Sequence, residues 1–149
     1  MKSVLRWLGS WLLAALLAFA IGSTLATQFI LANVAALGPE VDMAVRLQAT
    51  GHDLVGLSGS YLPLVSIAFL LGLPIAAGLA RFFPGQRQLL YIAAGAVAVM
   101  TIHLLIKAVL GLNGVAAVRT TAGLLSQGVA GACGGYLFCR LWTNRTPQA

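Results

Sequence analysis

Charged side chains are scarce in this chain, and acidic ones are nearly absent. Nine lysines and arginines and three acids account for all the charged side chains among 149 residues. That is 8% of the chain, against about 25% in ordinary soluble domains. Hydrophobic residues make up 60%, and most charges fall between long apolar stretches. Because a charge is costly at mid-bilayer and an apolar side chain is favoured there, the composition excludes a conventional soluble domain and predicts an integral membrane protein.

Cysteines and catalytic motifs are also lacking. Cys133 and Cys139 are six positions apart, which turns them to different helix faces, so we expect packing residues rather than a disulfide. No GxSxG, HExxH, kinase-like or phosphatase-like motif occurs. A membrane enzyme acting on lipid-linked substrates through His52, Asp53 and a serine is a less favoured alternative, because neighbouring residues rarely converge as a triad does. A haem held by His52 and His103 is less favoured still, and we expect no metal or cofactor.

Basic residues outnumber acids, but their distribution does not indicate nucleic-acid binding. The formal net charge is +6 and the pI about 10.2. The lysines and arginines are single and scattered beside apolar segments, with neither a basic cluster nor interleaved aromatic residues. Excess lysine and arginine at membrane edges explains the pI better. The partners we expect are therefore membrane lipids, together with a homo-oligomer or a larger membrane complex, and no nucleic acid.

Four apolar stretches are long enough to cross a bilayer, which needs about 20 helical residues. The predicted fold is an all-α membrane protein with four transmembrane helices in one bundle and a single domain over residues 1–149. We expect the four spans at about 7–37, 62–80, 88–112 and 121–141. The first is interpreted as an uncleaved helix rather than a secretory signal, since its apolar run continues past Thr24-Leu25-Ala26, where cleavage would fall.

Glycine, proline and polar residues predict the connections between these spans. Gly38-Pro39 ends the first span. The polar stretch that follows predicts a short extracytoplasmic helix or a re-entrant loop, with a helix over 41–50 and Gly51 as its stop. A small turn at Asn113-Gly114 is expected to join the last two spans.

The basic residues predict the orientation of the chain. The side that carries both chain ends collects most of them: Lys2, Arg6, Arg81, Arg87, Arg140 and Arg145. The other side has only Arg46 and Arg119 outside the spans, together with all three acids. By the positive-inside rule, both termini face the cytoplasm of a bacterial-type inner (plasma) membrane.

His103 and Lys107 are the most informative polar residues within a span. They are four positions apart and so share one helix face. An ionisable residue inside the membrane should face protein or water. We predict an outward-facing polar vestibule that binds or passes a small solute or ion; its candidate residues are His103, Lys107, His52, Asp53, Glu40 and Arg119. The alternative is that Lys107 extends to the headgroups while His103 bonds a neighbouring hydroxyl or carbonyl.

The fourth span is rich in glycine. Gly128, Gly131 and Gly135 lie along one helix stripe, and Gly95 of the third span is a plausible partner surface. Small residues allow two helices to approach closely. The stripe either seals the bundle or forms a subunit contact. The latter supports the second hypothesis for function, a structural or assembly subunit of a larger envelope complex.

Overall fold

The computed structural model describes residues 2–111 and 116–143, and the regular structure in these ranges is entirely helical. The elements are α1 (Lys2–Ala36), α2 (Met43–Gly56), α3 (Tyr61–Phe82), the 3-10 turn η1 (Pro84–Gln86), α4 (Arg87–Leu110), the 3-10 turn η2 (Ala116–Arg119) and α5 (Thr121–Thr143). An all-helical fold is thus confirmed. The expected turn at Asn113-Gly114 and the charge of Arg145 lie outside the described residues.

Three of these helices are long and apolar enough to cross a membrane. They correspond to Ser3–Ala36, Tyr61–Phe82 and Pro84–Val109, which matches the first three predicted spans. The expected fourth, in α5, is not among them. Its sequence contains Gly123, Ser126, Gln127 and further glycines, and these lower its hydropathy. Many of these small and polar residues are buried against the other helices.

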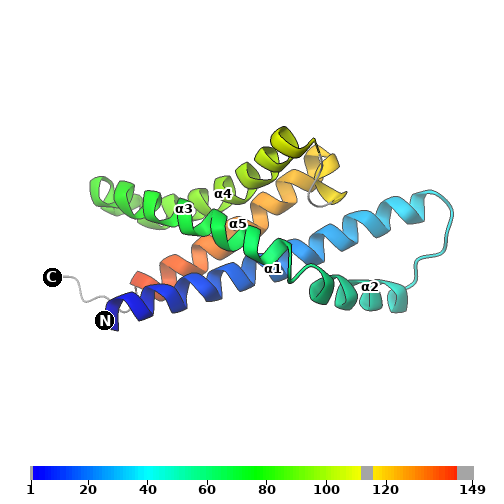
Figure 1. Ribbon diagram of the computed structural model, residues 1–149, viewed down its shortest axis with the longest axis horizontal. Coiled ribbons are helices and arrows are strands. Elements are labelled where there is room, and N and C mark those ends of the chain that lie inside the picture. The colour runs from blue at the N-terminus through cyan, green and yellow to red at the C-terminus, as the bar shows by residue number, and fades with distance from the viewer. Residues whose placement is uncertain (1, 112–115, 144–149) are drawn as a thin grey trace.

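The four long helices pack side by side with alternating direction. α5 lies between α1 and α4, α3 packs on α4, and α1 also contacts α3. The start of α1 and the end of α5 lie at the same end of the molecule (Figure 1). One cluster of buried side chains joins all four helices, including Phe19, Phe69, Tyr91 and Phe138. Short connections favour such antiparallel neighbours.

Glycines end two of the long helices. Gly38 has a φ of 109° and Gly111 a φ of 65°, a backbone region that residues with a Cβ rarely adopt. The amide of Gly111 donates to the carbonyl of Lys107 and closes α4. The predicted end of the first span at Gly38-Pro39 is confirmed. The 35 residues of α1 correspond to about 52 Å of helix, so α1 is longer than a bilayer core is thick.

The polar stretch after α1 forms a longer helix than the sequence predicts. Asp42 caps α2 by accepting the amide of Val45 at 2.8 Å. The helix then continues through Gly51, where we expected it to stop, and ends at Gly56. That expected boundary is wrong because glycine lowers helix stability without preventing helical geometry.

Side-chain hydrogen bonds tie α2 to α1. The hydroxyl of Thr27 donates to a carboxylate oxygen of Asp53 at 2.7 Å. The amide group of Gln28 donates to Thr50 at 3.1 Å and accepts from Arg46 at 2.7 Å. No residue of α2 is fully buried, but Leu54 packs partly buried against the core. Polar contacts and this apolar contact together position the helix against α1.

The glycine stripe of α5 faces α4. A Cβ on Gly131 would overlap the carbonyl oxygen of Gly95, and one on Gly135 would overlap that of Tyr91. Gly128 meets the side chain of Met100, also on α4. The two backbones approach each other as closely as small residues permit. Within this chain, the stripe therefore contributes to the packing of α4 on α5.

Candidate functional site

A small cavity lies where the last turns of α4 meet η2 and the start of α5. Its volume is about 110 Å³. His103 and Lys107 of α4 line it together with Arg119 at the end of η2, and Thr120 and Thr121 lead into α5. Since a water molecule occupies about 30 Å³ in the liquid, the space suits a small ion with a little water. The structure thus brings together three of the predicted vestibule residues, His103, Lys107 and Arg119.

His103 is the buried member of this group. Its side chain is only 1% exposed, and neither ring nitrogen has a hydrogen-bond partner among the described residues. Its ring packs on Tyr61 with centroids 5.6 Å apart. Lys107, one turn further on, is exposed. A buried polar group without a partner is unfavourable by about 1–3 kcal/mol, which makes a ligand for His103 physically reasonable.

The cavity carries positive charge. Lys107 and Arg119 both line it, and none of the three acids of the chain does. The amino end of α5 adds the positive end of a helix dipole. There, the hydroxyl of Thr120 accepts the amide of Gly123 at 3.1 Å. Two cationic side chains, a helix amino terminus and an imidazole form an environment for an anion.

The remaining predicted vestibule residues lie elsewhere. Glu40 and His52 are exposed, and Asp53 is half-buried against α1, where it accepts from Thr27. None of them lines the cavity that contains His103. Asp53 therefore serves the α1–α2 contact in this structure.

A buried polar cluster beneath the cavity was not predicted as a unit. The hydroxyl of Tyr61 donates to the side-chain oxygen of Gln127, and the amide group of Gln127 donates to the carbonyl of Gly22 at 3.1 Å. Tyr61, Gln127 and His103 are all at most 1% exposed. The cluster joins α1, α3, α4 and α5. Gln127 inside an apolar stretch was the available signal, whereas Tyr61 at the edge of a span gave none.

No arrangement in the described ranges resembles a metal centre. No three His, Cys, Asp or Glu side chains come together in residues 2–111 and 116–143. Cys133 and Cys139, both within the described ranges, form no disulfide. The hydroxyl of Ser58 donates to the carbonyl of Val55 at 2.6 Å, within its own helix end. Asp53, the aspartate of the enzymatic alternative, accepts from Thr27 on α1.

Comparison with known proteins gives no relative from which a function could be inferred. The chain matches no protein-family model, and no characterised protein or solved structure is significantly similar to it.

Proposed function

We propose that this protein binds a small inorganic anion in the cavity formed by His103, Lys107 and Arg119, and that it does so as a four-span inner-membrane protein. One observation carries the proposal: a buried imidazole that has no hydrogen-bond partner among the described residues lines the same small cavity as two cationic side chains. The anion would accept hydrogen bonds from these groups and from the hydroxyl of Thr121.

A topology with four spans would place this cavity on the outer side. The 23 residues of α5 correspond to about 34 Å, enough to cross a bilayer core of about 30 Å. Its low hydropathy is acceptable because α1 and α4 flank it, so fewer of its side chains need to face lipid. With both termini cytoplasmic by the positive-inside rule, the junction of α4 and α5 faces outward.

Each residue has a distinct role in the proposed site. Lys107 and Arg119 are exposed and would attract the anion from solution. His103 forms the inner end of the cavity. Both of its ring nitrogens are buried, so the anion would reach its N–H group after a small shift of the cavity wall. Tyr61, fixed by Gln127, supports the His103 ring from below.

No specific observation favours the assembly-subunit alternative. That hypothesis depended on a glycine stripe available to a second protein. Gly131 and Gly135 instead meet α4 of the same chain.

Anion titration of the purified protein in detergent tests the proposed function. Sulfate and chloride are titrated by calorimetry into the wild type and into Lys107→Gln, Arg119→Gln and His103→Phe. Saturable binding is expected, with each variant weakened about fivefold or more, as loss of a partly exposed charge-assisted hydrogen bond implies. Arg140→Gln, an exposed cation near the other end of α5, is the matched control and should bind as the wild type does. The proposal would be overturned if the wild type showed no saturable binding. It would also be overturned if Lys107→Gln and Arg119→Gln bound the anion with the wild-type affinity.

A further inference from the structure

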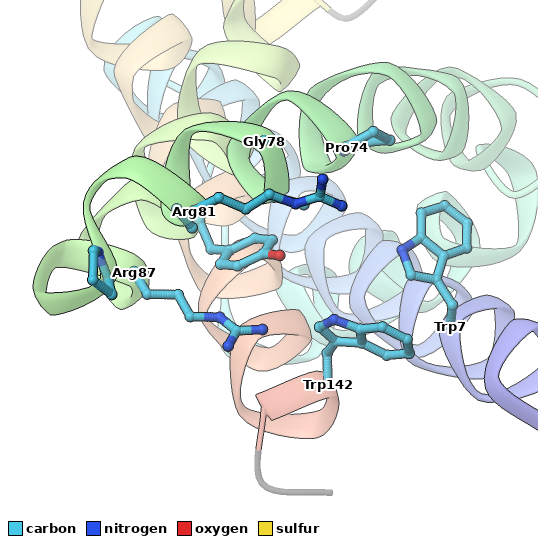
Figure 2. Close-up of a pocket in the computed structure, with 10 residues that line it drawn as sticks. Trp7, Pro74, Gly78, Arg81, Arg87 and Trp142 are labelled. Atoms are coloured by element: carbon cyan, nitrogen blue, oxygen red, sulfur yellow. The ribbon is translucent and has the colours of Figure 1, made fainter. Parts of the chain in front are cut away.

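A second, larger cavity opens at the opposite end of the bundle, near the start of α1 and the end of α5. Its volume is about 710 Å³. All four long helices contribute to its lining, including Trp7, Arg81, Arg87 and Trp142. Figure 2 shows Arg81 and Arg87 extending toward the same space, with Trp7 and Trp142 across it. The cavity is distinct from the small one beside His103.

None of the three acidic side chains of the sequence lines this cavity. All of them lie between Glu40 and Asp53, in the segment that follows α1. The Nε of Arg87 is buried and has no hydrogen-bond partner among the described residues, although Arg87 also interacts with the hydroxyl of Tyr91. A buried guanidinium N–H without an acceptor is unfavourable. A negatively charged ligand in the cavity would supply the acceptor that this N–H group lacks among the described residues.

The other walls of the cavity are apolar and aromatic. Trp7 packs edge-on against Phe138 at 5.9 Å between ring centroids, and Trp142 stacks on Phe138 at 6.4 Å. Pro74 and Gly78 of α3 complete the apolar side. A Cβ on Gly78 would meet nothing within 4 Å, so this wall has open space in front of it. Tryptophan at such a position is typical of the level of lipid headgroups.

We propose that this cavity binds an anionic phospholipid of the surrounding inner leaflet. The phosphate diester would lie between the guanidinium groups of Arg81 and Arg87, which suit a phosphate because each offers parallel N–H donors. An acyl chain would extend along Pro74 and Gly78. Basic pockets between transmembrane helices on the cytoplasmic side commonly recognise such headgroups. Nothing in this inference depends on anion binding beside His103.

Fluorescence quenching in nanodiscs tests the lipid site directly. The protein is reconstituted in phosphatidylcholine, and brominated phosphatidylglycerol or brominated phosphatidylcholine is added in increasing proportion. Trp7 and Trp142 line the cavity, so a bound brominated chain should quench their emission. We expect an apparent preference of about tenfold for phosphatidylglycerol in the wild type, given two arginines at the membrane surface. Equal quenching by the two lipids would overturn the proposal.

Two variants distinguish lipid binding in the cavity from attraction of anionic lipid by general surface charge. Arg81 is exposed, so Arg81→Gln should fold normally; combined with Arg87→Gln, it should reduce the preference to less than twofold. Gly78→Leu keeps both arginines but fills the open space, and it should reduce the preference as well. Arg140→Gln removes an exposed cation near the same end of the bundle; it is the control and should retain the preference. If Arg81→Gln/Arg87→Gln or Gly78→Leu keeps the wild-type preference for phosphatidylglycerol, the lipid does not bind in this cavity.

Inorganic phosphate distinguishes a lipid from a free anion. Millimolar inorganic phosphate should leave quenching by brominated phosphatidylglycerol unchanged, because the apolar walls contribute to binding of the lipid only. If inorganic phosphate displaces the lipid completely, the cavity is a site for free phosphate and the lipid assignment is wrong.

Discussion

The hydroxyl of Tyr61 on α3 donates a hydrogen bond to the side-chain oxygen of Gln127 on α5, 66 residues further along the chain. Gln127 in turn donates to the carbonyl of Gly22 on α1, and the Tyr61 ring packs on His103 of α4. These three buried contacts together connect all four long helices. They also form the support beneath the proposed anion cavity.

Tyr61→Phe should destabilise the bundle by about 1 kcal/mol. The substitution leaves the Gln127 oxygen buried without its donor, a loss of about 1–3 kcal/mol in water-soluble proteins. Hydrogen bonds between membrane helices average about 0.6 kcal/mol, with a maximum near 1.7, so the lower part of that range applies. The free energy of unfolding is measured by SDS titration from mild detergent micelles.

Tyr136→Phe is the matched control for this measurement. Tyr136 is 37% exposed on α5 and lies near the guanidinium of Arg140, 5.5 Å from its ring centroid. Loss of its hydroxyl should change the free energy of unfolding by less than about 0.5 kcal/mol, as is usual for surface substitutions. Equal effects of Tyr61→Phe and Tyr136→Phe would show that the Tyr61–Gln127 contact contributes no stability.

Gly131→Ala should weaken the packing of α4 on α5 and destabilise the protein. The added methyl group would overlap the carbonyl oxygen of Gly95, and backbone cannot move aside as a flexible side chain can. Overpacking of this kind is destabilising by about 1–3 kcal/mol. Thermal unfolding in detergent, followed by circular dichroism, should therefore show a clear decrease in Tm.

Gly9→Ala is the control, because Gly9 is also helical but a Cβ there meets nothing within 4 Å. Alanine exceeds glycine in helix stability by about 0.5–1 kcal/mol, so the Tm should be unchanged or slightly higher. A Tm for Gly131→Ala that equals the wild-type value would contradict the close approach of α4 and α5.

The sequence predicts the helices well because the bilayer imposes a strong pattern. The observed ends of α3 and α4 fall within about two residues of the predicted spans, since apolar runs with glycine, proline and arginine at their edges leave few alternatives. The end of α2 was predicted wrongly, because Gly51 breaks a helix only where no other contact holds it. Thr50 and Asp53, on either side of it, bond to α1.

The candidate site was predictable only in part. His103 and Lys107 share a face by helix geometry alone, and Arg119 was on the same side by charge counting. The sequence gives no relative rotation of helices, so it could not show that His103 packs on Tyr61 or that Arg81 and Arg87 line one cavity. Side-chain contacts between helices depend on packing that local patterns do not encode.

Gln28→Leu should loosen α2 from α1. This amide makes two hydrogen bonds to α2, to Thr50 and from Arg46, and each contributes about 0.5–1.5 kcal/mol. Hydrogen–deuterium exchange of the α2 amides should become about tenfold faster, whereas exchange in α5 stays the same. Gln48→Leu is the control, because Gln48 lies exposed on α2. Unchanged exchange in Gln28→Leu, or an equal increase in both variants, would show that these bonds do not hold α2.

The number of membrane crossings can be decided by where reporters at two positions fold. Without a crossing by α5, three spans would leave the chain ends on opposite sides; with it, both ends face the cytoplasm. We expect a fluorescent protein fused after Ala149 to fluoresce and alkaline phosphatase at the same point to be inactive. Fusion after Gly111, which removes α5, should reverse both results, because the reporter then follows the third span. The same outcome at Gly111 and Ala149 would mean that α5 lies on one side of the membrane. The four-span topology proposed for the anion site would then be wrong.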